Sequence, residues 1–510
     1  MGRVKSATRN IAFGYIGQVA TAHISFVLRT VFLMHLNEKL LGINSTYTNI
    51  LAVLNMAELG IGTALNFSLY GPVARGEIEK IKSYMRLYRK AYYAIACVVA
   101  GVGLLISPFL KYLVKNPGNV SLRDLTLFYF IFLFNTVSSY FVAYKFSLVN
   151  AEQKNYIQTN ILTITKVVTS LIQIVVIVVT ENFYLFLLTD AAVQLIQKIF
   201  VSRYLNKMYP YLKDKDAKPL SKAESKEIWK KTEALVYHKV GDVARLQTDA
   251  IIISSFIEVS VSGFVDNYNL VISSVSNFVN IIFNSVISSF GNLIATESKE
   301  RQFSMFKVYR FFAFWFYGFS AVGFMVLLTP LISIVWGQKW VLPTVTVYCI
   351  LMDYYFRGER IVLSNYKTAA GVFEPDKYLT LIQGAVNLVL SIILVQTPLG
   401  LTGVYIGTIV SGLLGNIVRP VIIYRTCFDS KNIAGYYVET IKYFLSMVFV
   451  LIICRFIAGF VLTDLNMLTF LIMVVIITVI FNGVYFLLYG RSEEFKYVYS
   501  RVKEKLSKRG

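Results

Sequence analysis

The feature that most constrains this chain is a long series of apolar segments, each of a length that crosses a lipid bilayer as a helix. A bilayer core of ~30 Å takes about 20 helical residues, because each residue rises ~1.5 Å. These runs predict an all-α polytopic membrane protein with about 14 transmembrane helices. The predicted spans are 10–35, 40–70, 88–112, 122–148, 156–180, 183–206, 230–257, 262–296, 303–335, 341–366, 376–397, 400–426, 437–461 and 464–489.

The distribution of basic residues predicts the orientation. Of the 50 lysines and arginines, 40 fall in alternate connections that include both termini, and five fall in the opposite set. The positive-inside rule then places both termini in the cytoplasm. The net charge of +21 is thus explained by loops, and we expect no nucleic-acid partner. The four cysteines lack metal-ligand spacing and the outer loops are too short for a catalytic domain, so we expect no metal, cofactor or enzyme activity.

An internal repeat divides the predicted spans. An offset of 221 positions pairs Gly42 with Gly263 and Tyr47 with Tyr268, and one of 222 pairs the later tyrosines 156 and 378. Six helices per repeat is an even number, so a pseudo-two-fold axis along the membrane normal relates the halves. The predicted parts are an N-terminal six-helix bundle (1–208), a cytoplasmic linker (209–226), a C-terminal six-helix bundle (227–430), two extra transmembrane helices (431–490) and a basic tail on anionic inner-leaflet lipids (491–510).

Polar side chains recur at helical spacing inside several of these spans. The repeat offset pairs Ser45 with Asp266, Thr48 with Asn269, Asn55 with Ser276 and Thr63 with Asn284. Span 10–35 carries a similar stripe of Gln18, Thr21, Ser25 and Arg29. Two bundles facing each other across a cleft lined by these helices are the architecture of a transporter that works by alternating access.

Span 230–257 carries a charged stripe. Its members, His238, Asp242, Arg245 and Asp249, are spaced by four, three and four residues, which places them on one face of a helix. A charge at mid-bilayer costs ~2.5–3.5 kcal/mol, so these groups are expected to face a wet cavity or one another.

Three short motifs follow one another along the repeat: the turn from Gly42 to Tyr47, the stretch ELGIGTA at 58–64, and WGQKW at 336–340. With the span count and the basic linker, they make the chain resemble the Wzx-type oligosaccharide-lipid flippases of the polysaccharide transporter family. The resemblance implies flipping of an undecaprenyl-pyrophosphate-linked oligosaccharide across the bacterial cytoplasmic membrane for surface polysaccharide biosynthesis, with polysaccharide polymerase or assembly proteins as partners. It also implies that cavity arginines bind the pyrophosphate, a role that Arg29 and Arg245 match by helix and depth.

Two interpretations stay open for each cationic candidate. Arg245 either clamps a diphosphate or forms an internal ion pair with Asp242 or Asp249. Arg29 either contacts cargo or extends toward the headgroups. Lys166 has no charged neighbour at helical spacing and is expected to point inward. The predicted substrate-binding residues of the central cavity are Arg29, Arg245, Lys166, Gln18 and Asn269.

Carboxylates in the spans are candidates for coupling to a proton or a sodium ion. They are Asp242, Asp249, Glu58 and Asp266. For Glu58 and Asp266, the alternative is a buried carboxylate held by hydroxyl and amide neighbours. On span 341–366, Asp353, Arg357 and Arg360 share a face near the predicted cytoplasmic end, where the sequence favours positive-inside anchoring over a pyrophosphate-attracting mouth.

Two other functions compete with oligosaccharide-lipid flipping. A cation-coupled multidrug exporter on the same fold would need an acidic cavity, whereas Arg29, Lys166 and Arg245 favour an anionic cargo. Flipping of a peptidoglycan precursor, lipid II, is a close variant of the first function. The sequence has no Walker loop, so direct nucleotide hydrolysis is not expected.

Overall fold

The computed structural model describes residues 2–55, 58, 68–213, 218–221, 224, 226, 236–237, 239–284, 287–372, 374–429, 432–497 and 499–500. The described part is helical and holds no strand. Its packing divides the chain into two compact units, which we describe separately. Unit 1 comprises Met1–Asp266 and Thr380–Gly400, and unit 2 comprises Asn267–Leu379 and Leu401–Gly510. The bundle boundaries inferred from the repeat stay a prediction.

Ten helices of the described chain are long and apolar enough to span a membrane, and each overlaps a predicted span. They are Phe13–His35, Ile78–Leu113, Leu122–Ala143, Tyr156–Thr180, Phe183–Met208, Lys299–Trp336, Lys377–Val395, Gly400–Cys427, Ile433–Val461 and Met467–Tyr489. The remaining predicted spans correspond to α2, the region around α11, α12 with α13, and α15. The prediction of an all-α polytopic membrane protein is confirmed.

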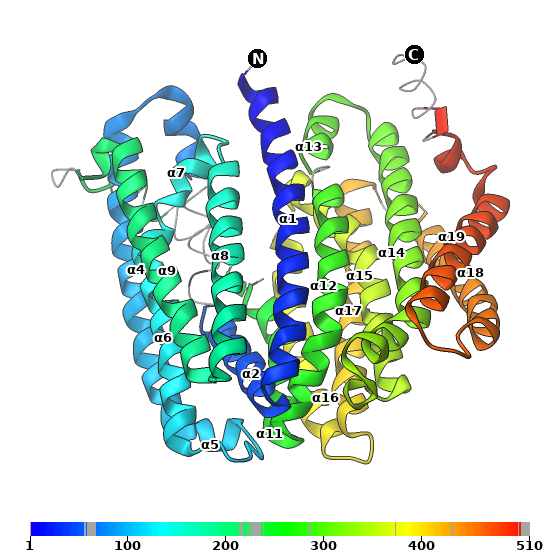
Figure 1. The fold of residues 1–510 in the computed structure, drawn as a ribbon. Coiled ribbons are helices and arrows are strands. Elements are labelled where there is room, and N and C mark those ends of the chain that lie inside the picture. The colour runs from blue at the N-terminus through cyan, green and yellow to red at the C-terminus, as the bar shows by residue number, and fades with distance from the viewer. Residues whose placement is uncertain are drawn as a thin grey trace. The chain divides into compact units, whose positions relative to one another are not determined.

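Unit 1 is a row of long helices packed side by side. Its helices are α1 (Gly2–His35), α2 (Glu38–Leu54), α4 (Ile78–Ile106), η1 (Ser107–Phe109), α5 (Leu110–Leu113), α6 (Leu122–Ala143), α7 (Phe146–Ala151), α8 (Tyr156–Thr180), α9 (Phe183–Met208), η2 (Pro210–Lys213), α11 (Thr248–Phe256) and most of α16 (Lys377–Val395). Helix α1 packs on α8, α8 on α9, α9 on α6 and α6 on α4 (Figure 1). Asn37, Ser121 and Asn182 cap α2, α6 and α9 by accepting main-chain N–H groups, which fixes where these helices begin.

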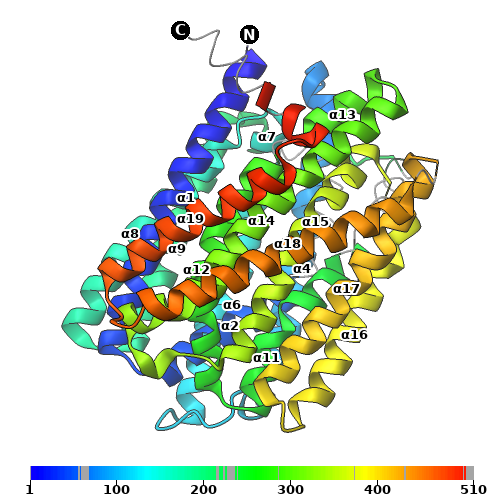
Figure 2. The ribbon, with the colours of Figure 1, turned by 90° about the vertical axis from the view of Figure 1, so that its right-hand side faces the viewer.

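Unit 2 is organised around α14. Its helices are most of α12 (Val259–Asn284), then α13 (Ile287–Thr296), α14 (Lys299–Trp336), η3 (Gln338–Trp340), α15 (Thr344–Ala370), η4 (Glu374–Asp376), α17 (Gly400–Cys427), α18 (Ile433–Val461) and α19 (Met467–Tyr489). Helix α14 packs against α15, and α18 and α19 lie alongside it (Figure 2). The two helices predicted as additions to the repeat are therefore part of this packing.

The repeat is visible in equivalent contacts. The Tyr47 hydroxyl donates to the main-chain oxygen of Leu125, at the start of α6, at 2.9 Å. The equivalent Tyr268 hydroxyl accepts the main-chain N–H of Leu342, just before α15, at 3.1 Å. Both tyrosines are fully buried. Each half therefore uses an equivalent tyrosine to join an equivalent pair of elements, as the pseudo-two-fold axis predicts.

Candidate functional site

Arg29 and Asp266, predicted separately as a cargo contact and a coupling carboxylate, form an ion pair in unit 1. Arg29 lies six residues before the end of α1, and its Nη2 donates to Asp266 Oδ2 on α12 at 2.6 Å. The side chains are 14% and 30% exposed, so neither group is fully enclosed by the protein. A guanidinium binds carboxylate and phosphate oxygens with the same geometry, so an anionic ligand can compete with Asp266 for Arg29.

Lys166 lies at mid-depth on α8, ten residues from Tyr156 and 14 from Thr180. The residue is exposed, and α8 packs against both α9 and α1. An exposed ammonium at this depth costs ~2.5–3.5 kcal/mol against lipid, so an orientation toward water is favoured. Gln18 is half-buried on α1, the helix that packs against α8.

Helix α12 presents polar side chains along one face. Asn269, Ser273, Asn277 and Asn284 are exposed, with steps of four, four and seven residues. Ser276, which the repeat placed in this stripe, is buried instead, and its hydroxyl bonds to the main chain one turn earlier at 2.7 Å. Asn269 and Asn284 of the predicted stripe are thus exposed, and Asn277 is exposed in place of Ser276. The amides and hydroxyl of these exposed residues both donate and accept hydrogen bonds, as sugar hydroxyls require.

The charged stripe of span 230–257 is divided by a turn. The predicted continuous helix is interrupted at Gln247, and α11 begins only at Thr248. Arg245 is 7% exposed, Asp249 is half-buried, Asp242 is exposed, and His238 lies outside the described residues. The three described charges therefore differ in their access to water. Their roles as cargo or ion contacts stay predictions.

The buried polar face of α16 was missed from the sequence. A Cβ on Gly241 would lie 2.2 Å from the Thr380 carbonyl oxygen, so the helical segment 239–246 packs directly on α16. Asn387 Oδ1 lies 3.5 Å from the Thr248 hydroxyl. The buried polar residues of α16 are Thr380, Gln383, Asn387 and Ser391. Their spacing by three, four and four inside an apolar segment is the signal that would have found them.

Glu58 is half-buried beside hydroxyl groups. Its carboxylate lies within hydrogen-bonding reach of the Tyr92 hydroxyl on α4. Nearby, Tyr140 donates to Asn55 Oδ1 at 2.5 Å. Residues 56–57 and 59–67 lie outside the described residues, and with them most of the ELGIGTA motif and Thr63.

A second polar network of unit 1 joins α6 to α9. Lys198 is 6% exposed, and its ammonium donates to the Asn135 carbonyl and the Ser138 hydroxyl, each at 2.8 Å. The Asn135 side-chain amide donates to Asp190 at 3.0 Å. Lys198 lies inside α9, ten residues before its end. The neutral carbonyl and hydroxyl oxygens accept hydrogen bonds from the ammonium group, so a lysine can be buried within an otherwise apolar helix.

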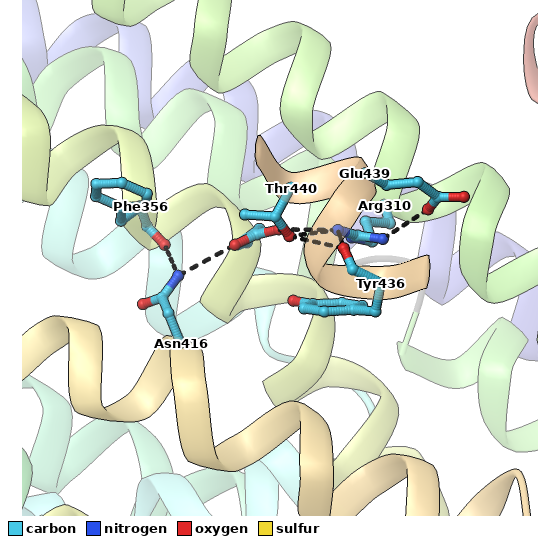
Figure 3. A network of polar contacts seen from close by, with 7 residues as sticks. Arg310, Phe356, Asn416, Tyr436, Glu439 and Thr440 are labelled. Carbon is cyan, nitrogen blue, oxygen red and sulfur yellow. Dashed lines mark hydrogen bonds and ion pairs between the residues drawn. The ribbon is translucent and has the colours of Figure 1, made fainter. Parts of the chain in front are cut away.

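In unit 2, a network around Arg310 joins α14, α15, α17 and α18 (Figure 3). Arg310 is 2% exposed and donates to Glu359 at 3.1 Å and to Glu439 at 2.8 Å. Its guanidinium carbon lies 3.6 Å from the centre of the Tyr436 ring, and Asn416 reaches Glu359 at 3.3 Å. A buried arginine between two carboxylates fastens α18 to the bundle, because losing one partner would leave charges buried and unpaired.

Asp353, Arg357 and Arg360 share a face of α15, as predicted, but not near its end. Asp353 accepts from Arg360 at 2.8 Å and from Arg357 at 3.1 Å. The helix continues past the predicted residue 366 to Ala370, so Arg357 lies at its midpoint, 13 residues from each end. The prediction that these residues lie close to the cytoplasmic end of the span stays a prediction.

Outside the spans, two contacts hold the ends of the predicted linker. Glu224 accepts from the Ser221 hydroxyl at 2.8 Å and pairs with Lys80 at 3.2 Å, and these partners, Ser221 first, hold the pKa of the Glu224 carboxyl below its ordinary value. Tyr209 donates to Glu152 at 2.8 Å, and burial raises the pKa of the Tyr209 phenol. The Lys80 pair is exposed, so its contribution to stability is small.

Within the described ranges, no cluster of histidine, cysteine and carboxylate side chains is suited to hold a metal ion. In unit 1, what the site offers is binding: the exposed Lys166, the half-buried Arg29, and the Asp266 carboxylate that pairs with Arg29.

No protein-family model and no curated protein matches the sequence. Among solved structures, lipid II flippase MurJ in an inward closed conformation matches with a TM-score of 0.68 at 14% identity, covering 94% of this chain and 98% of that one. An inward-facing multidrug resistance MATE family transporter matches with a TM-score of 0.57 at 14% identity, covering 79% and 94%. A MOP superfamily transporter from Pyrococcus furiosus, described as having a binding pocket of reverse polarity, matches with a TM-score of 0.53 at 14% identity, covering 82% of this chain and 94% of that one. The protein is therefore a multi-pass membrane protein with the fold of the MOP superfamily transporters.

Proposed function

We propose that this protein is a transporter that flips an undecaprenyl-pyrophosphate-linked oligosaccharide from the cytoplasmic to the outer leaflet by alternating access. The observation that carries the proposal is an exposed lysine, Lys166, at the middle of α8, the helix that packs against α1, which carries Arg29. A diphosphate is the lipid-linked group that two such cations would neutralise. No covalent chemistry on the cargo is required.

In the proposed cycle, the diphosphate displaces Asp266 from Arg29 and takes a second contact from Lys166. The released carboxylate then takes up a proton or a sodium ion, which couples ion movement to cargo. Gln18 and Asn269 contact the sugars through their amides. Arg245, buried in unit 1, is a cargo contact of another state of the cycle.

The setting we propose is the bacterial cytoplasmic membrane, with both termini in the cytoplasm and the basic tail on anionic lipids of the inner leaflet. The pathway is surface polysaccharide biosynthesis, so polymerase or assembly proteins are the proposed partners. These assignments rest on the charge distribution and on the resemblance described above.

One observation favours a second candidate, the flipping of lipid II. The MurJ structure accounts for 94% of this chain, whereas the MATE and other MOP transporters reported above account for 79–82%. A lipid flippase thus matches more of the molecule than a drug exporter does. The accessible cations also disfavour a cationic drug, because like charges at mid-bilayer repel.

The test is a lipid extraction from cells depleted of the protein, followed by mass spectrometry of undecaprenyl-pyrophosphate glycans. We expect a completed oligosaccharide on the carrier to build up, and to clear with wild type and with Lys166→Arg but not with Lys166→Gln. Lys111→Gln, which removes an exposed lysine from α5, is the matched control and is expected to clear it. Depletion without build-up would refute the proposal, and build-up of lipid II instead would replace it with the second candidate.

A further inference from the structure

Helix α1 of unit 1 carries an exposed histidine at mid-depth. The membrane-spanning part of α1 runs from Phe13 to His35, so His23 lies ten residues after its start and twelve before its end. At ~1.5 Å per residue, His23 is ~15 Å or more from either end of the span. Its side chain is exposed, so it does not serve to pack a core. Ionisable side chains at this depth usually face water or one another, which makes His23 a candidate functional residue.

The main chain of α1 determines which ring nitrogen of His23 is open. Nδ1 lies 2.8 Å from the main-chain oxygen of Val19, one turn earlier. A carbonyl oxygen only accepts hydrogen bonds, so Nδ1 carries a proton and donates it to this bond. In the neutral ring, Nε2 is then the open acceptor, and a proton that binds there makes the imidazole cationic. Because the charge of an ordinary imidazole changes between pH 5 and 8, this residue type suits reversible proton binding near neutral pH.

Helices α1 and α8 lie side by side in a parallel arrangement. Near the start of the two spans, the ring of Phe13 stacks on that of Tyr156, with their centres 6.0 Å apart. At the other end, His35 Nδ1 lies 3.1 Å from Glu181 Oε1. The residues paired by these contacts are 143 and 146 positions apart in the chain. The two helices therefore run in the same direction and stay level with each other along the whole span.

This register places Lys166 of α8 at the depth of His23. Offsets of 143–146 set His23 opposite residues 166–169, and Lys166 is exposed as His23 is. The other titratable or charged side chains within these two spans, with the partners of their ion pairs, are Tyr15, Arg29, His35, Tyr156, Glu181 and Asp266. Those on α1 and α8 lie six or more residues along the helix from His23 or Lys166, which is ~9 Å or more. Lys166 is therefore the charged side chain of this helix pair at the level of His23.

A bound anion at this level would favour a proton on His23. In the proposed cycle, Lys166 contacts the diphosphate of the cargo, which brings several negative charges to the depth of the imidazole. Opposite charges attract more strongly where little water separates them, so the diphosphate stabilises an imidazolium. The effect is reciprocal by linkage, because a proton that the diphosphate helps to bind increases the affinity for the diphosphate by the same factor.

We propose that His23 binds a proton at Nε2 when the anionic cargo binds, so that a proton and the cargo move together. This inference rests on the proposed function and adds to it a proton site apart from the ion pair of Arg29 with Asp266. The proton comes from water and adds to the lone pair of Nε2, and no bond to the cargo forms. Hard cations take oxygen ligands, so the ring nitrogen selects a proton over a sodium ion.

The test measures proton uptake when farnesyl pyrophosphate binds to the purified full chain in detergent. The protein is titrated with the probe at about pH 7.5 in weak buffer that contains a pH indicator, and binding is measured in parallel by native mass spectrometry. We expect His23→Gln to take up about half to one proton fewer per bound probe than wild type. The comparison also corrects for protons that the probe itself exchanges, because both proteins bind the same probe.

The matched control is His35→Gln, which removes the other described histidine of α1, at the end of the span, and is expected to take up as many protons as wild type. His23 is exposed, so thermal unfolding of His23→Gln is expected to match that of wild type; if this variant does not fold, His23→Ala decides. Equal uptake by wild type and the deciding variant overturns the inference and leaves the transport function in place, as does an equal loss in His35→Gln. A wild-type protein that does not bind the probe removes the diphosphate-binding function and the inference together.

Discussion

At the scale of single residues, the ion pair between Arg29 and Asp266 explains how a charged arginine is stabilised inside a membrane protein when no cargo is bound. A lone guanidinium at this depth would be costly, and the carboxylate at 2.6 Å neutralises it while leaving both groups partly exposed. The two residues are separated by 237 positions in the chain. The sequence identified both as functional candidates, yet it assigned them different roles, because spacing reveals partners only within one helix.

The charge-swapped variant Arg29→Asp with Asp266→Arg tests whether this pair binds cargo or only stabilises the fold. The swap keeps an ion pair between α1 and α12, so we expect the protein to remain folded, with thermal unfolding within a few degrees of wild type. Clearance of the lipid-linked oligosaccharide in depleted cells is expected to be lost, because a carboxylate on α1 repels the diphosphate that the guanidinium would bind. Full clearance by the swapped protein would mean that the pair is structural.

At the scale of helices, the sequence predicts the spans well where charged residues lie outside the helices. The predicted helix ends are wrong where a charged residue is neutralised inside a helix. The sequence ended span 341–366 before Lys367, but α15 continues to Ala370 because Lys367 is buried against Asp376 at 2.8 Å. Arg419 of α17 approaches the same carboxylate at 3.2 Å. Such neutralisation depends on η4 and α17, which no local pattern reveals. The polar face of α16 was missed for the same reason, since its partners lie elsewhere in the chain.

Glycine also allows helices to pack closely, and Gly42, which the internal repeat pairs with Gly263, is one such position. A Cβ on Gly42 of α2 would lie 1.8 Å from the Val259 carbonyl oxygen, whereas a Cβ on Gly459 of α18 would meet nothing within 4 Å. Gly42→Ala is therefore expected to destabilise the protein by about 1–3 kcal/mol, since main chain must move to admit the methyl group. Gly459→Ala is the control and is expected to be neutral or slightly stabilising. Thermal unfolding of the purified variants measures the difference, and equal midpoints would contradict the close packing of α2 on the start of α12.

At the scale of the whole molecule, the apolar segments and the internal repeat are enough to predict the architecture. The attachment of α18 depends instead on a buried charge, Arg310. The fourteen-span, two-fold plan needed only segment lengths and equivalent residues such as Tyr47 and Tyr268. Nothing in α18 alone indicates that Glu439 and the main chain of Tyr436 bind Arg310 of α14. That network fastens α18 to unit 2, and α19 packs on α14 through the rings of Tyr485 and Phe314. We therefore expect both helices to follow the movements of unit 2 during transport.

Orientation is the remaining property of the whole molecule that the charges predict, and cysteine labelling checks it. In a variant without Cys97, Cys349, Cys427 and Cys454, a single cysteine replaces either Lys111 or Arg75, exposed residues beyond opposite ends of α4. A membrane-impermeant maleimide applied to spheroplasts is expected to label Lys111→Cys, and to label Arg75→Cys only after permeabilisation. This follows because the connection 71–90 carries six basic residues and its predicted cytoplasmic location lowers their free energy. Labelling of Arg75→Cys in intact spheroplasts would invert the orientation, and with it the direction in which Arg29, near the end of α1, would release its cargo.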